Sequence, residues 1–228
     1  MSFDVICNGC GAPSSPSVGI CPYCKTVMTS NKNGADQKTL DAFLQLYNQG
    51  ETQRALILGT ELERQKPEFR SDLLFVMTFV KVLLECEAPT SRILGLLTHA
   101  HLQNIESADL NDYMEIVSAK NALKKGASDP GEIALKNILR RSPQNLHAHF
   151  ILGGHYFWTD ELTTPAIAHM ETCVRIRPNF LRAWGCLGAI YKKIGNATLA
   201  HMAFQKCVQL ETDPKMKVFF ESQLAKLG

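Results

Sequence analysis

The sequence predicts an all-α fold behind a small N-terminal segment of different composition. Residues 36–227 have helical periodicity and lack both strand alternation and βα patterns. A hairpin of two helices joined by a short turn can be recognised in residues 183–214. Four of the eight cysteines lie within residues 7–26, a stretch rich in Gly, Pro and Ser. These observations predict helical hairpins preceded by a small module with its own chemistry.

Bulk composition excludes several classes of protein. The 228 residues are 45% hydrophobic and 20% charged, and the net charge of +2 is too small to argue alone for a nucleic-acid or membrane partner. The longest apolar run, residues 73–84, contains Lys81 and is too short to span a bilayer. The first ten residues lack the basic and apolar parts of a secretory signal. We therefore expect a cytoplasmic protein without membrane insertion, in which paired cysteines favour metal over disulfides.

The N-terminal cysteines form two C-x-x-C pairs with ten residues between them. Each short gap lets both sulfurs converge, and four thiolates suit one tetrahedral zinc ion with no position left for substrate. Two disulfides and a redox-active pair are the alternatives, the latter disfavoured because no βαβ pattern surrounds either pair. We expect one structural Zn²⁺, bound by Cys7, Cys10, Cys21 and Cys24.

This segment resembles the short zinc ribbons of the form C-x-x-C-G…C-P-x-C. The first knuckle matches as CNGCG at residues 7–11, and the second as CPYC at residues 21–24. Lys25 stands where that family usually has a second glycine. The resemblance implies a zinc ribbon over residues 1–28, and the polar residues 29–35 that follow predict a linker.

The unit at residues 183–214 resembles the tetratricopeptide repeat pattern W-x2-L-G-x2-Y…A-x3-F…P. The matching residues are Trp184, Leu187, Gly188, Tyr191, Ala200, Phe204 and Pro214. The small residues Gly188 and Ala200 suit a close crossing of two helices, and Gly195-Asn196 suits the turn. The resemblance implies a superhelix of stacked α-hairpins, a solenoid.

The 34-residue period of that family extends the pattern backwards. It places Trp184 on Phe150, Gly188 on Gly154, Tyr191 on Phe157, Ala200 on Ala166, Phe204 on Met170 and Cys207 on Cys173. Residues 126–143 and 50–67 supply weaker matches, with a divergent hairpin between them whose helices span about 71–86 and 90–104. We predict hairpins at 36–69, 70–106, 107–145, 146–179 and 180–214, then a capping helix within residues 215–228.

No catalytic motif is recognisable, so we expect a protein that is not an enzyme and has no catalytic residues. His147 and His149, like His99 and His101, are two residues apart and so lie on different faces of a helix, which favours packing or surface roles over a second metal site. The four remaining cysteines, Cys86, Cys173, Cys186 and Cys207, fit helical patterns and are expected to behave as buried small hydrophobic residues.

The tetratricopeptide resemblance implies a groove lined by the first helix of each hairpin. Its partner-binding positions fall on Tyr113, Lys120, Lys124, His155, Trp158, Arg182, Lys192 and Lys193. A groove with basic ends and an aromatic centre suits a protein partner that offers an acidic peptide or helix. We therefore expect a scaffold or adaptor, in a setting such as a secretion or motility complex.

An alternative is nucleic-acid binding through the ribbon and the basic C-terminal region. Residues 170–228 contain nine Lys and Arg against four Asp and Glu, whereas the ribbon and linker contain only Lys25 and Lys32. The sequence leaves open whether the ribbon docks on the repeats or binds a separate partner.

Overall fold

The computed structural model describes residues 5–6, 13–14, 34–103, 107–126, 128–159 and 163–227. The chain divides into two compact units, one of residues 1–48 and 52–111 and one of residues 49–51 and 112–228. At the N-terminus, β1 (Val5–Ile6) pairs antiparallel with β2 (Pro13–Ser14), with Val5 opposite Ser14. The four cysteines that we expect to bind zinc lie outside the described residues.

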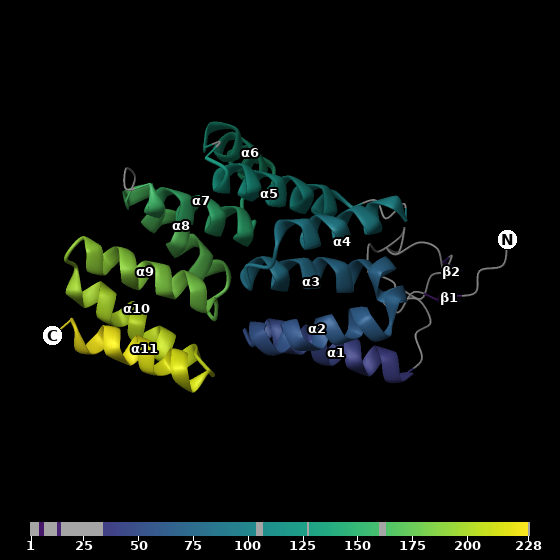
Figure 1. The fold of residues 1–228 in the computed structure, drawn as a ribbon, viewed down its shortest axis with the longest axis horizontal. Helices are drawn as coiled ribbons and strands as arrows, with labels where there is room; N and C mark the ends of the chain where they lie inside the picture. The colour runs from purple at the N-terminus through teal and green to yellow at the C-terminus, as the bar shows by residue number, and fades with distance from the viewer. Residues whose placement is uncertain are drawn as a thin grey trace. The chain divides into compact units, whose positions relative to one another are not determined.

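The first unit contains two helical hairpins joined by a short 3-10 helix (Figure 1). Its elements are α1 (Gly34–Asn48), α2 (Thr52–Gln65), η1 (Pro67–Ser71), α3 (Leu73–Glu85) and α4 (Thr90–Leu102). The core is built around α3, an almost wholly apolar helix whose residues from Phe75 to Glu85 are buried apart from Lys81. A helix that is apolar on all sides is stable only when surrounded, so α3 is the central helix of this unit.

Aromatic rings form the contacts that hold α3 in place within this unit. Phe43 of α1 lies 5.3 Å from Phe75 and 6.1 Å from Phe79, and Phe69 of η1 lies 5.3 Å from Phe75, between ring centroids. The buried carboxylate of Glu85 accepts hydrogen bonds from the Tyr47 and Thr52 hydroxyls at 2.9 and 3.2 Å. Among the described residues, no helix has the length and apolar character needed to cross a membrane.

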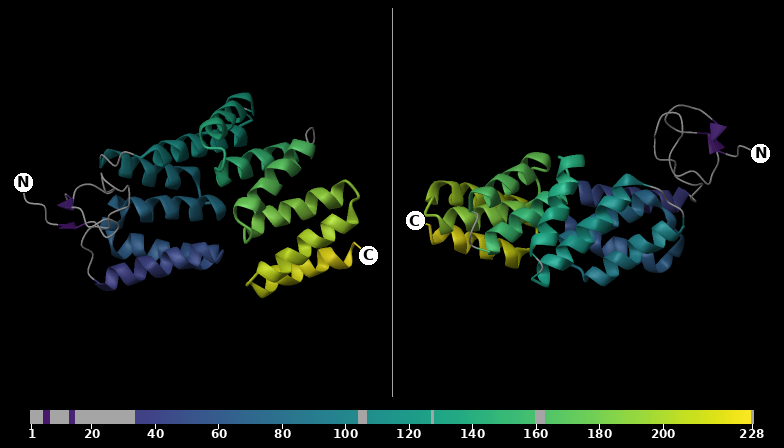
Figure 2. Two further views of the ribbon diagram at one scale, coloured as in Figure 1. Left: turned by 180° about the vertical axis from the view of Figure 1, so that it is seen from behind. Right: turned by 90° about the horizontal axis from the view of Figure 1, so that it is seen from above.

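The second unit contains three hairpins and a final helix. Its elements are α5 (Ala108–Lys124), which begins within the first unit, α6 (Ser128–Arg141), α7 (Leu146–Trp158), α8 (Thr163–Ile176), α9 (Leu181–Lys193), α10 (Ala197–Leu210) and α11 (Pro214–Ala225). Successive helices pack on one another, α7 on α8, α8 on α9, α9 on α10 and α10 on α11 (Figures 1 and 2). Since α7 also contacts α9, first helices of adjacent hairpins are neighbours, as expected for a tetratricopeptide-like solenoid.

Three hairpins turn at a glycine in the left-handed backbone region. The φ angles are +84° at Gly50, +83° at Gly126 and +77° at Gly195. A side chain is strained at such angles, so glycine is the residue that ends the first helix at low cost. After Gly195, the Asn196 side chain caps α10 by accepting from the Leu199 amide at 3.1 Å. The predicted turn at Gly195-Asn196 is thus confirmed.

The predicted close crossing of α9 and α10 is also confirmed. A Cβ added at Gly188 would lie only 2.6 Å from the Phe204 ring, and Ala200 of α10 is fully buried. Cys173 and Cys207 are buried as expected, while Cys86 and Cys186 are half-buried. The Cys173 thiol donates to the Leu146 carbonyl at 3.5 Å.

Helix ends differ from the expected boundaries by a few residues. The first helix of the second hairpin begins at Leu73 because Asp72 caps it, accepting from the Phe75 amide at 2.8 Å. The final helix begins at Pro214 because Asp213 caps it through the Lys215 amide, with proline at a first-turn position. Helix α1 begins at Gly34, two residues before the predicted start of the repeats.

Candidate partner-binding surface

Helix α7 forms the centre of the candidate surface. Asn145 caps it by accepting from the Ala148 amide at 3.0 Å, and the helix ends at Trp158. Its sequence, LHAHFILGGHYFW, contains no Asp, Glu, Lys or Arg. One side is buried in the unit, whereas Phe150 and Phe157 are half-buried and Trp158 is 81% exposed. An indole exposed to this extent is unusual for a residue that normally buries most of its ring.

Helix α9 places two cations over the aromatic rings of α7. The Arg182 guanidinium lies 4.9 Å from the Phe150 ring centroid, and the Lys193 ammonium lies 5.7 Å from that of Phe157. Since Arg182 is at the start of α9 and Lys193 at its end, the two helices run parallel. Both distances are within the range of attractive cation–π contacts, which fix the positive groups above the rings.

We call these five residues, Phe150, Phe157, Trp158, Arg182 and Lys193, the α7–α9 face. The Phe157 and Trp158 rings lie 5.1 Å apart at 57°, so aromatic surface continues from the covered ring to the exposed indole. Helix α9 also lacks Asp and Glu, and its Arg182, Lys192 and Lys193 give this pair of helices charge of one sign. The face can therefore offer an apolar anchor beside positive charge, a combination that recognises carboxylate-bearing peptides.

The other residues predicted to bind a partner lie in varied environments. Lys192 is exposed and its ammonium donates to Gln223 of α11 at 3.0 Å, Lys124 is exposed at the end of α5, and Lys120 is half-buried on the same helix. His155 is half-buried with its ring 5.9 Å from that of Tyr156. Of the residues predicted to bind a partner, the structure therefore brings three together, Trp158, Arg182 and Lys193. Their shared contacts are with the rings of Phe150 and Phe157.

Tyr113 requires a correction, because it lines no surface. Its side chain is only 6% exposed, and its hydroxyl lies 2.8 Å from Nδ1 of His147. Carrying over a repeat position placed Tyr113 in the groove, but its ring packs between α5 and α7 instead. We leave it out of the proposed surface.

Phe150 and Phe157 are the residues that the sequence reasoning missed. Both match the repeat pattern, at the positions of Trp184 and Tyr191 one period earlier, and neither falls at a groove position of that pattern. A usable signal was the complete absence of Asp and Glu from α7 and α9. Because neither helix contains an acidic residue, the charged side chains that this pair of helices contributes are all positive.

Tyr191 anchors the inner side of α9 to the preceding hairpin. Its hydroxyl donates to Glu171 of α8 at 2.8 Å. Burial, followed by the neighbouring Glu171, raises the pKa of Tyr191 to about 12, so the phenol stays protonated as a donor. This bond helps to hold Lys192 and Lys193, which immediately follow, in a fixed position.

No family model and no curated protein matches the chain. Among solved structures, it is similar to TTC0263, a thermophilic TPR protein of Thermus thermophilus, with 17% identity over 83% of this chain and 99% of that one and a TM-score of 0.53. It also matches YrrB, described as a TPR protein with an unusual peptide-binding site (14% identity, 81% and 90% covered, TM-score 0.42), and a mutant of MamA (18% identity, 68% and 84% covered, TM-score 0.46). The likeness to TTC0263 concerns the fold alone, and it supports the predicted tetratricopeptide-like arrangement of helical hairpins.

Proposed function

We propose that this protein is a non-enzymatic cytoplasmic adaptor whose α7–α9 face binds an acidic segment of a protein partner, within a larger assembly such as a secretion or motility complex. The observation that carries the proposal is the pair of cation–π contacts beside the exposed Trp158, on two helices without a single acidic residue. The tetratricopeptide-like fold supports it, because solenoids present extended surfaces of this kind.

The chemistry of the face suggests how each part contributes. Trp158 supplies a large rigid ring, the side chain most often found to dominate interface energy. Arg182 can recognise a carboxylate through two parallel N–H donors, and Lys193 adds a second positive charge at the far end of α9. Held over aromatic rings, both cations lose less side-chain entropy when a partner binds.

Quantitative affinity purification tests this proposal. We expect wild-type protein and the control Ile133→Ala, whose residue is 58% exposed on α6, to recover the same partner. The double variant Trp158→Ala/Arg182→Ala should lose that partner. Fluorescence anisotropy with the acidic segment of the recovered protein should then show at least about tenfold weaker binding to the double variant. Equal recovery of the partner by all three proteins would show that the α7–α9 face does not bind it.

We further propose that residues 1–28 form a ribbon around one structural Zn²⁺ and are joined by a linker to the helical repeats. The spacing of Cys7, Cys10, Cys21 and Cys24 supports this, as does the antiparallel pairing of β1 and β2 on either side of the first pair. When bound, the zinc would supply folding free energy that so short a segment cannot obtain from apolar burial. Elemental analysis should find one zinc per chain, lost in Cys7→Ser/Cys10→Ser; full retention of zinc in that variant would contradict the assignment.

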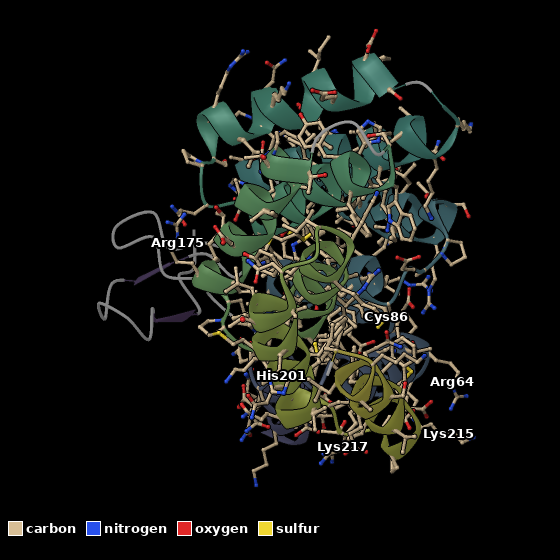
Figure 3. The ribbon with its side chains drawn as sticks, turned by 90° about the vertical axis from the view of Figure 1, so that its left-hand side faces the viewer. Arg64, Cys86, Arg175, His201, Lys215 and Lys217 are labelled. Carbon is tan, nitrogen blue, oxygen red and sulfur yellow. The ribbon has the colours of Figure 1, made fainter. Side chains whose placement is uncertain are left out.

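Nucleic-acid binding is the second candidate, favoured by the basic character of α11. Lys215 and Lys217 are exposed at its start, as Figure 3 shows, and its first turn has no acidic residue. Phosphate contacts would make affinity for DNA or RNA decrease steeply with salt. Affinity that stays constant between low and physiological salt would exclude this candidate.

A further inference from the structure

Two histidines meet where α7 crosses α8. Nδ1 of His149 lies 2.8 Å from Nδ1 of His169, with ring centroids 5.0 Å apart. Gly153 makes this approach possible, since a Cβ there would lie 2.9 Å from the His169 Cβ. One 34-residue period later, the corresponding positions are Ala183 and Ala203, both buried. Alanines suffice for packing there, so the imidazoles are not needed to close the hairpin.

The hydrogen bonding of His149 fixes which of its nitrogens carries the proton. Nε2 lies 3.0 Å from the Pro143 carbonyl oxygen, which can only accept. Nε2 is therefore the protonated nitrogen of the neutral ring, and Nδ1 directs a lone pair at His169. A backbone carbonyl that receives the outer N–H is also the usual support of a metal-binding histidine, because it fixes the ring orientation.

The surroundings keep both rings neutral while leaving them accessible. Burial, followed by His149 and Lys136, lowers the pKa of His169 to about 4, and burial also lowers the pKa of His149. The Lys136 ammonium is itself paired with Glu132, whose carboxylate also accepts from the Tyr156 hydroxyl. Neither histidine is fully buried, so an ion can reach the pair.

We propose that His149 and His169 bind one divalent transition-metal ion, Ni²⁺ or Cu²⁺ by preference, through their two Nδ1 atoms. On binding, the single proton between the rings moves through water to Nε2 of His169. Both rings then tilt away from the line that joins the two Nδ1 atoms, so that each Nδ1 lone pair points to the metal. Nitrogens bound at about 2.1 Å lie about 3.0 Å apart at a right angle and about 3.4 Å apart in a tetrahedron. The observed 2.8 Å is closer to the right-angled geometry of nickel and copper sites.

The protein supplies two ligands to this ion, and water supplies the rest. Among the described residues, no cluster of three or more His, Cys, Asp or Glu is arranged to hold a metal. An ion here would tie α7 to α8 in the hairpin that carries Phe157 and Trp158. The site uses none of the cysteines expected to bind zinc, and it does not depend on the proposed partner.

Nickel titration of the full chain tests the proposal. The chain is first loaded with zinc and gel-filtered, so that its cysteine pairs are occupied, and Ni²⁺ binding is then measured by calorimetry. We expect one nickel per chain, with affinity at least about tenfold weaker in His169→Asn. The control His201→Asn, at an exposed position of α10 labelled in Figure 3, should bind like wild type. Equal affinity in wild type and His169→Asn would overturn the site.

A second measurement needs no variant and remains decisive if His169→Asn fails to fold. Paramagnetic Ni²⁺ should broaden the ring resonances of His149 and His169 before those of the other histidines, of which the chain has seven in all. Broadening that starts at any other histidine, or no broadening at millimolar nickel, would show that His149 and His169 are joined only by a hydrogen bond and do not bind the metal.

Discussion

The fourth and fifth hairpins, α7–α8 and α9–α10, have one register and differ in how they use it. Both have glycine at the same register position of the first helix, Gly154 and Gly188, although only Gly188 lies at a close helix crossing. Both also bury a cysteine on the second helix, at Cys173 and Cys207. The two buried cysteines mark a position that packing requires in both hairpins. Their agreement over 34 residues explains why the fold can be recognised in so divergent a sequence.

The same two hairpins differ at positions that packing leaves open. Trp158 corresponds to Lys192, an exposed indole against an exposed ammonium. Phe157 corresponds to Tyr191, so a ring beneath a cation replaces a phenol bound to Glu171. The comparison shows that the two hairpins keep their buried packing positions and differ at others. We place partner binding at the positions that differ.

The shared cysteines give the largest expected effect. Burial raises the pKa of both Cys173 and Cys207 to about 12, so their thiolate population near pH 8 is about a thousandfold below that of an ordinary cysteine. In the native protein a thiol reagent should therefore leave Cys173 and Cys207 unlabelled, whereas the half-buried Cys86 and Cys186 should react before them. Mass spectrometry of labelled peptides checks this, and early labelling of Cys173 would contradict it.

The same thiols predict a pH dependence of stability. The folded chain keeps protons that the unfolded chain releases above pH 9.0, the ordinary value for a cysteine. Their contribution to stability is therefore complete below that pH and decreases as pH rises toward 12. Cys173→Ala should reduce this decrease in urea unfolding, and an unchanged slope would count against the assignment.

The two glycines at matching repeat positions should respond differently to alanine. At Gly188 the new methyl would meet the Phe204 ring at 2.6 Å, and we expect a loss of about 1–3 kcal/mol from overpacking. At Gly154 it would meet only the end of Met170 at 4.0 Å, so Gly154→Ala should be neutral or stabilising by up to about 1 kcal/mol. Urea unfolding measures the change in the free energy of unfolding for both variants. Equal changes would contradict the expected difference between the two glycines.

Removing the Tyr191 hydroxyl should have a smaller effect. Tyr191→Phe loses the bond to Glu171 and makes the position resemble Phe157, at a cost of about 1 kcal/mol. The double variant with Glu171→Ala should lose little more, since the two side chains act as a pair. Additive losses in thermal unfolding would show that the bond does not couple the helices.

Replacing Trp158 should have the smallest effect on stability. Because its ring is 81% exposed, Trp158→Ala should change the free energy of unfolding by no more than about 0.5 kcal/mol. Phe150→Ala should lower the free energy of unfolding more than Trp158→Ala does, because the Phe150 ring packs 5.0 Å from Phe180 and beneath Arg182. Comparable losses in the two variants would place Trp158 in the core rather than on the binding face.

Local patterns predicted the hairpins because their causes are local. Gly195 needs its left-handed angle, Gly188 must accommodate Phe204, and both requirements repeat along the chain. Contacts between hairpins were harder to predict. Two-residue spacing correctly separates His147 from His149, yet nothing in it reveals that one contacts Tyr113 on α5 and the other His169 on α8. Such partners depend on how neighbouring helices are rotated, which periodicity leaves undefined.

Photo-crosslinking from position 158 tests the central claim most directly. A photo-reactive benzoylphenylalanine replaces Trp158 in one sample and Ile133 of α6, also exposed, in another, and living cells are irradiated. We predict a discrete crosslinked protein from position 158 alone, joined through a segment rich in Asp and Glu. Identical products from both positions, or a joined segment without acidic residues, would contradict the assignment of the α7–α9 face as the partner-binding surface.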